Sequence, residues 1–322
     1  MNVLVTGGAG YIGSTLVPLL LARGHRVRVL DALLHGGRPL LGVWPDPGFE
    51  FCRGDLRDAR TRRQAVQGMD AVVHLAAIVG DPACARDPEL ARAVNLEASL
   101  GLLEACGEAN VRRVLFASTC SNYGRMANPE SYVDETSTLS PVSLYAETKV
   151  AVEHAVLELA RQGGVCATPL RFATVFGVSP RMRFDLTVNE FTAELLTTGK
   201  LVVFGEKFWR PYIHVRDAAR GIATVLEAAP ESVSGEVFNV GATDENYQKQ
   251  QLVDLIRPCV PHAEVEYVHR AEDPRDYRVS FSKIRDALGF EVSRRVPDGI
   301  REVAELIRSG AVADLRAPEY RN

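Results

Sequence analysis

The sequence lacks several features that mark special classes of protein. No apolar run in its 322 residues approaches the ~20 residues of a transmembrane helix, so we expect no membrane contact. The six cysteines form no CxxC pair, which argues against a disulfide framework and gives no sign of a metal site. The N-terminus enters a strand pattern without a basic start, so we expect no signal peptide and a reducing, cytoplasmic location.

Neither sign of charge is in large excess. The chain has 37 Lys and Arg against 41 Asp and Glu, a net charge of −4, and no basic field that would hold a nucleic acid. With 46% hydrophobic and 24% charged residues, the composition is that of a globular protein. The length predicts two domains, or one large α/β unit with an appendage.

Short apolar runs alternate with helical periods over the first two-thirds of the chain. This alternation predicts βαβ units and therefore a doubly wound parallel sheet, an α/β fold. We expect strands at 3–5, 27–30, 71–75, 114–117 and 166–171, with another before Gly54, and helices at 12–22, 88–110 and 145–162.

The rhythm changes after Arg171. A loop and a helix are expected in 177–205, and the tail 258–322 shows short strands and one clear helix at 298–309. We therefore predict a core domain of residues 1–170 and a smaller α/β cap of residues 171–322. Parts of 212–241 are expected to pack back against the core.

A glycine-rich turn joins the first strand to the first helix. Its spacing is GxxGxxG, with Gly7 for a tight turn, Gly10 for close approach of a pyrophosphate and Gly13 for packing of helix on strand. The helix N-terminus would offer free N–H groups to the phosphates. The alternative is a glycine-rich turn without a ligand.

Acidic residues follow the next two strands. Asp31 ends the second strand, where a carboxylate can bind the adenosine ribose and would repel a 2′-phosphate, so NAD is favoured over NADP. Asp55 and Leu56 follow the third strand and could hold the adenine edge. A solvated strand-end Asp and a plain turn are the alternatives.

Tyr145 and Lys149 lie four residues apart on a predicted helix and share a face. A nearby ammonium favours the phenolate and draws the pKa of the phenol toward the working range of a base. The run Ser118–Gly124 follows a predicted strand whose end should face the cleft, and a hydroxyl there could hydrogen-bond a substrate alkoxide. Taken separately, these could be an exposed Tyr–Lys pair and a polar turn.

These motifs, together with His74-Leu-Ala-Ala77, resemble those of the extended short-chain dehydrogenase/reductases from residue 1 to about residue 288. The closest resemblance is to nucleotide-sugar epimerases and dehydratases such as UDP-glucose 4-epimerases. It implies an NAD-binding Rossmann domain, a nucleotide-sugar-binding cap, and Thr119, Tyr145 and Lys149 as catalytic residues. It assigns cofactor contacts to Gly7, Gly10, Tyr11, Ile12, Gly13, Asp31, Asp55, Leu56, Leu75, Ala76, Ala77, Asn95, Ser118, Tyr145 and Lys149.

The same resemblance implies that the cap binds a nucleotide-diphosphate sugar. Arginine suits forked contacts to phosphate, although surface arginines are the alternative. The long helices at 88–110 and 145–162 resemble those through which family members form homodimers. The implied substrate contacts are Thr119, Thr174, Asn189, Arg210, Arg270 and Asp273.

Two departures bear on the reaction. Cys120 and Ser121 stand where 4,6-dehydratases of the family carry acids, which counts against ordinary dehydration; Cys120 is either a weak acid beside the sugar or a small buried thiol. Thr174 replaces an Asn that normally contacts substrate.

The resemblance therefore favours an NAD-dependent epimerase acting at C4 of a UDP- or GDP-hexose through a 4-keto intermediate. A dehydratase or a 4-ketoreductase on the same scaffold is the alternative. A non-catalytic dinucleotide sensor is a third, weaker hypothesis.

Overall fold

The computed structural model describes residues 1–126, 128, 131–268 and 275–322. Its strands are β1 (Asn2–Thr6), β2 (Arg26–Asp31), β3 (Phe49–Arg53), β4 (Ala71–His74), β5 (Arg113–Thr119), β6 (Cys166–Phe172), β7 (Thr174–Phe176), β8 (Lys200–Phe204), β9 (Trp209–His214), β10 (Phe238–Val240), β11 (Asn246–Gln248) and β12 (Glu264–Val268). Its α-helices are α1 (Gly13–Ala22), α2 (Ala59–Val66), α3 (Asp81–Arg86), α4 (Pro88–Arg92), α5 (Ala98–Glu108), α6 (Leu144–Gln162), α7 (Thr187–Thr198), α8 (Val215–Glu227), α9 (Pro230–Val233), α10 (Lys249–Ile256), α11 (Ser282–Leu288) and α12 (Val296–Arg308).

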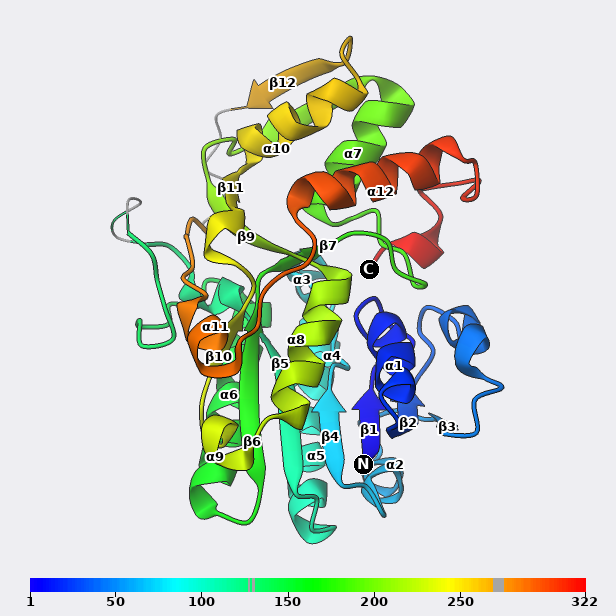
Figure 1. Cartoon of the computed structure of the whole chain (residues 1–322), viewed down its shortest axis with the longest axis vertical. Coiled ribbons are helices and arrows are strands. Elements are labelled where there is room, and N and C mark those ends of the chain that lie inside the picture. The colour runs from blue at the N-terminus through cyan, green and yellow to red at the C-terminus, as the bar shows by residue number, and fades with distance from the viewer. Residues whose placement is uncertain (127, 129–130, 269–274) are drawn as a thin grey trace.

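The core is a seven-stranded sheet in the order β10-β6-β5-β4-β1-β2-β3, with every pairing parallel. Helices cover both of its faces (Figure 1). In β1, Val3 and Val5 belong to one buried hydrophobic cluster, and Leu4, which lies between them in sequence, belongs to a second. The predicted doubly wound parallel sheet is confirmed.

The last strand of this sheet comes from far along the chain. β10 lies beside β6, and α8 packs against α1 on the front face in Figure 1. The remaining strands form a three-stranded sheet, β11-β9-β7, and a parallel pair, β8 with β12. Together with α7, α10 and α12 they bury a separate cluster above the main sheet (Figure 1).

Two local expectations were wrong. The helix expected over 88–110 is interrupted by a π-helical turn, Ala93–Glu97, between α4 and α5. A π turn adds one residue per turn, and here it carries the buried Asn95, whose amide bonds both the N–H and the C=O of Ile78. The tail holds a second helix, α11, which is too short to show a clear period; its C-cap residue, Gly289, is in the left-handed conformation.

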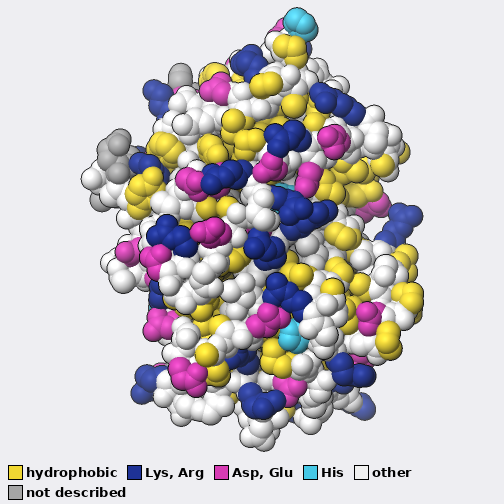
Figure 2. Space-filling view, in the orientation of Figure 1, with side chains coloured by type: hydrophobic (Ala, Val, Ile, Leu, Met, Phe, Trp, Pro, Cys, Tyr) yellow, Lys and Arg dark blue, Asp and Glu magenta, His cyan; other side chains and the backbone are white. Residues whose placement is uncertain are grey.

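The surface agrees with the balanced composition. Basic and acidic side chains are interspersed over the face shown in Figure 2, with no field of one sign. In the described part of the chain, no helix combines the length and apolar character that crossing a bilayer requires.

Candidate active site

The turn between β1 and α1 requires glycine at two of the predicted positions. Gly7 has φ +73°, and a Cβ there would lie 2.8 Å from the backbone of Ala76. A Cβ on Gly13 would lie 2.4 Å from the carbonyl oxygen of Gly7. Gly10 is more open, since only that same oxygen, at 3.1 Å, lies within 4 Å of a Cβ. The backbone of this turn can therefore approach a phosphate closely.

Replacing Gly13 with Ala is expected to weaken NAD binding by at least about tenfold. The added Cβ would press against fixed backbone, which costs about 1–3 kcal/mol and distorts the phosphate turn. The measurement is NAD affinity by calorimetry. Gly107→Ala in α5 is the matched control, since its Cβ would meet nothing within 4 Å. Equal NAD affinity in the two variants would contradict the role of this turn.

Asp31 lies at the end of β2 and supports the same turn. Its carboxylate accepts the N–H of Ala9 at 2.9 Å and that of Leu33 at 2.7 Å. Burial raises the pKa of this carboxyl despite both bonds. Asp55, after β3, is held differently: its carboxylate accepts the backbone N–H and the guanidinium of Arg57, which lowers its pKa.

Tyr11 and Asn189 join the phosphate turn to the segment before α7. The phenol of Tyr11 donates to the carbonyl of Gly177 at 2.5 Å, and the Asn189 amide donates to the phenol oxygen at 3.2 Å. Asn189 also bonds the backbone of Gly177 and Arg183, so its amide serves internal contacts in this structure. Ile12 is the N-cap residue of α1, with no side-chain capping bond.

The carboxyl end of β4 continues into Leu75, Ala76 and Ala77, beside the phosphate turn. The N–H of Leu75 donates to the carbonyl oxygen of Thr6, and the N–H of Ala76 donates to the Thr6 hydroxyl. Asn95, on the π turn, fixes the next residue of this loop through the bonds to Ile78. The predicted cofactor residues of these elements thus surround one edge of the sheet.

The three predicted catalytic residues converge at the same edge. The Lys149 ammonium donates to the carbonyl of Ala117 at 2.8 Å and lies 5.8 Å from the ring centroid of Tyr145. Two residues after Ala117, the Thr119 hydroxyl accepts the N–H of Ser121 at 3.1 Å. Burial raises the pKa of the Tyr145 phenol above its ordinary value, so added positive charge is needed to form a phenolate.

Burial lowers the pKa of Lys149 from 10.5 to about 8. Between these two values the unfolded chain binds more protons than the folded one, so stability rises with pH. Lys149→Met removes this dependence on pH. In the cofactor-free protein at pH 7, we expect the free energy of unfolding of the variant to be about 1–2 kcal/mol higher than that of wild type. This figure allows for the lost hydrogen bond to Ala117.

Urea unfolding between pH 7 and pH 10.5 would measure this effect. The advantage of the variant should shrink as the pH rises through the window. Lys200→Met, at an exposed lysine paired with Glu264, should show no such trend. A variant that is less stable than wild type at pH 7 would contradict the expectation.

A buried ion pair that the sequence did not reveal lies beneath these residues. Arg171 on β6 and Glu153 on α6 approach to 2.5 Å, with side chains 5% and 1% exposed. Glu153 also accepts the hydroxyl of Ser118 at 2.7 Å, and Arg171 donates to the phenol oxygen of Tyr123 at 2.9 Å. The pair therefore joins the helix that carries Tyr145 to the strand end that carries Thr119.

A tyrosine from the C-terminal part of the chain lies beside the loop after Thr119. Tyr277 is buried, its hydroxyl lies 3.4 Å from that of Ser121, and the guanidinium of Arg210 lies 5.2 Å from its ring centroid. Arg210, on β9, is thereby connected to the loop after Thr119. No pattern in the sequence indicated Tyr277, because its position depends on the chain crossing between that loop and β9.

Cys120 does not face the site. Its thiol is buried and donates to the carbonyl of Arg171 at 3.3 Å, and burial raises its pKa well above the ordinary value. Of the two interpretations, the structure supports the small buried thiol. Thr174 begins β7, while Arg270 and Asp273 lie outside the described residues.

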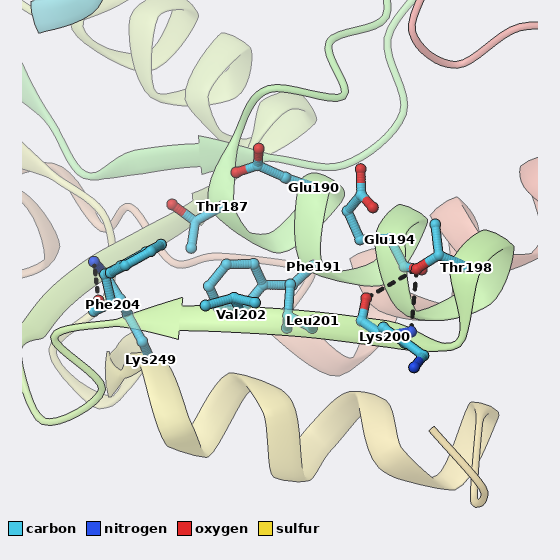
Figure 3. Close-up of a pocket in the computed structure, with 10 residues that line it drawn as sticks. All are labelled: Thr187, Glu190, Phe191, Glu194, Thr198, Lys200, Leu201, Val202, Phe204 and Lys249. Atoms are coloured by element: carbon cyan, nitrogen blue, oxygen red, sulfur yellow. Dashed lines mark hydrogen bonds between the residues drawn. The ribbon is translucent and has the colours of Figure 1, made fainter. Parts of the chain in front are cut away.

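A separate pocket of about 500 Å³ lies between α7 and β8. Figure 3 shows acidic side chains of α7 on one side and apolar side chains of β8 below them. Its lining is Thr187, Glu190, Phe191, Glu194, Thr198, Lys200, Leu201, Val202, Phe204 and Lys249. None of the predicted site residues that the structure describes lines it.

The residues present fit NAD. The turn excludes side chains at Gly7 and Gly13, where a dinucleotide-binding turn needs backbone packing. Asp31 could hold the adenosine ribose, and Lys149 the nicotinamide ribose. When bound, NAD would supply the hydride acceptor and donor of the reaction.

Comparison with known proteins agrees with this geometry. Residues 3–241 match the model of the NAD dependent epimerase/dehydratase family. The chain is 28% identical to a UDP-glucose 4-epimerase of Lactobacillus helveticus, over 93% of this chain and 94% of the relative, and 31% identical to a dTDP-glucose 4,6-dehydratase of Streptomyces niveus, over 99% and 97%.

Among solved structures, it resembles the Thermus thermophilus UDP-glucose 4-epimerase in complex with NAD. The TM-score is 0.84 and the identity 31%, over 97% of this chain and all of the other. The family match spans most of the chain and includes the phosphate turn, Tyr145 and Lys149. The chain therefore belongs to the NAD dependent epimerase/dehydratase family.

Proposed function

We propose that this enzyme epimerises a nucleotide-diphosphate hexose at C4, with UDP-glucose as the first substrate to test. The observation that carries the proposal is the convergence of Tyr145, Lys149 and Thr119 at the sheet edge beside the phosphate turn. UDP-glucose 4-epimerases among the relatives and neighbours support the choice of substrate.

In this proposal Tyr145 is the base that removes the proton of the sugar 4-hydroxyl. Lys149 stabilises the phenolate by its charge, and the Thr119 hydroxyl hydrogen-bonds the same sugar oxygen as it becomes a carbonyl. After the keto-sugar turns over, Tyr145 returns the proton to the new hydroxyl. The proton is thus borrowed and given back, so the reaction needs no external acid.

The diphosphate and nucleotide are proposed to extend toward the cap. Arg210 would meet the diphosphate, and Thr174, Asn189, Arg270 and Asp273 remain proposed substrate contacts. The pocket between α7 and β8 offers apolar surface for a base: Phe191 and Leu201 line it and share a buried cluster with Tyr212, two residues after Arg210. In this arrangement the sugar lies near Tyr145 and the nucleotide on the cap.

A 4,6-dehydratase is the second candidate, supported by the relative from Streptomyces niveus. Dehydration needs an acid or base at the neighbouring carbons, and the buried Cys120 and the neutral Ser121 supply none at the usual positions. A ketoreductase using NADPH is disfavoured by Asp31, whose carboxylate would repel a 2′-phosphate.

The test incubates the purified protein and NAD with UDP-glucose, and in parallel with GDP-mannose, and analyses the products by NMR and mass spectrometry. We expect an epimer of unchanged mass without net accumulation of reduced cofactor. A product lighter by one water would support the dehydratase, and stoichiometric consumption of NADPH the reductase. Either result would overturn the epimerase.

We also propose that the enzyme is a cytoplasmic homodimer. None of its six cysteines, all within the described part of the chain, is disulfide-bonded, as expected of a reducing compartment. The helices expected at a dimer interface, α5 and α6, lie next to each other. Light scattering on the purified protein would give the number of subunits.

A further inference from the structure

A carboxylate that no motif predicted contacts the N-cap residue of the helix that carries Tyr145. Asp81 begins α3, immediately beyond the loop that follows β4. One of its oxygens pairs with the Arg275 guanidinium at 2.9 Å, and the other accepts the Ser143 hydroxyl at 2.7 Å. The side chains of Asp81 and Arg275 are 29% and 27% exposed, so the pair is only partly screened by water.

Ser143 connects this pair to the catalytic helix. It is the N-cap residue of α6, where its hydroxyl oxygen accepts the N–H of Ala146 at 3.3 Å. The same hydroxyl donates its proton to Asp81, which fixes its direction. Tyr145 follows two residues later, so Asp81 constrains the first turn of the helix that carries the base.

Arg275 connects the pair to the cap. The backbone carbonyl of the neighbouring Asp276 accepts a hydrogen bond from the N–H of Met126, and its side-chain carboxylate accepts one from the N–H of Trp209. Tyr277, the next residue, lies beside Ser121 in the active site. The ion pair thus links α3 and α6 to the segment that crosses the site.

The charges around Tyr145 fall into two groups. Lys149 on α6 and Arg183 before α7 favour the phenolate. Asp81 and Cys84 on α3 oppose it, and so does the Tyr277 phenol when ionised. Among these opposing groups Asp81 is the carboxylate, and Arg275 is the cation paired with it.

We propose that Asp81 and Arg275 are positioning residues of the active site, which together set the ionisation of Tyr145. Asp81 orients Ser143 and places negative charge near the phenol, and Arg275 offsets that charge. The inference rests on the proposed role of Tyr145 as the base. A purely structural ion pair would change stability alone when either partner is removed.

The test uses two conservative variants with opposite expectations. Asp81→Asn keeps an acceptor for Ser143 but removes the negative charge. The pKa that defines the acid limb of the kcat–pH profile should therefore fall by about 0.5–1 unit. Arg275→Gln leaves Asp81 without its countercharge, so the pKa of the acid limb should rise by a similar amount. Asp70→Asn, in the Asp70–Arg112 pair at the opposite edge of the sheet, should leave the profile unchanged.

A second measurement does not depend on the reaction. The absorbance of tyrosinate is titrated in the NAD-bound protein, with Tyr145→Phe as the subtracted reference, in wild type and in both variants. Shifts of opposite sign support the inference even if no sugar is epimerised, which would overturn the proposed function alone. Shifts of the same sign, or none, in a folded NAD-bound protein overturn the inference.

Discussion

Replacing Tyr145 with Phe is expected to lower kcat by about 10²–10⁴-fold, the range typical of removing a general base. The substitution deletes one oxygen and keeps the ring, so the packing of α6 should persist. Lys149 would retain its bond to Ala117, and the phosphate turn lies on other elements. NAD binding should therefore stay within about threefold of wild type.

Steady-state epimerisation and NAD calorimetry on the same preparation would measure both quantities. Tyr267→Phe is the matched control, because Tyr267 lies on the outer strand β12 and its loss of one oxygen should leave kcat unchanged. If Tyr145→Phe retained near-wild-type kcat, Tyr145 would not be the base. If the variant also lost NAD binding, its lower activity could not be attributed to proton transfer alone.

The sequence predicted best what short stretches of chain determine. The phosphate turn lies within seven consecutive residues, Gly7–Gly13, and glycine is required at Gly7 by the backbone that follows β4 and at Gly13 by the turn itself. The fold class followed from strands and helices long enough to show their periods. In both cases local patterning and tertiary structure agree, so one could be inferred from the other.

The charge pairs could not be predicted in the same way. Asp81 and Arg275 are distant in sequence, and only the path of the chain across the site brings them together. Glu153 did leave a signal: it lies one turn beyond Lys149 and two beyond Tyr145, on the helix face that these two residues share. An acid on a buried face requires a partner, but the sequence does not say that Arg171 supplies it.

The π turn shows a further limit. A period of 3.6 residues predicts one helix over 88–110, yet Asn95 must aim its amide at Ile78 to hold the loop after β4. The added residue of the π turn satisfies that tertiary contact at the expense of regular helix geometry. Periodicity reports which face is buried, and it contains no information on such a single amide contact.

Replacing Glu153 with Leu is expected to lower the free energy of unfolding by about 3–5 kcal/mol, because it leaves the Arg171 guanidinium buried without a countercharge. The Ser118 hydroxyl loses its acceptor in the same change. Adding Arg171→Met should recover most of this loss, since two apolar side chains of similar volume replace a buried ion pair at little cost. Urea unfolding of the cofactor-free protein would measure both variants.

Glu158→Gln provides the control on the same helix. Its partner Arg161 is 76% exposed and Glu158 itself 45% exposed, so water screens this pair and its loss should not be measurable. The double variant separates the electrostatic explanation from a general intolerance of Leu in α6: if it is no more stable than Glu153→Leu alone, the cost does not come from the unpaired guanidinium. A loss below about 1 kcal/mol in the single variant would likewise show that water or another group compensates Arg171.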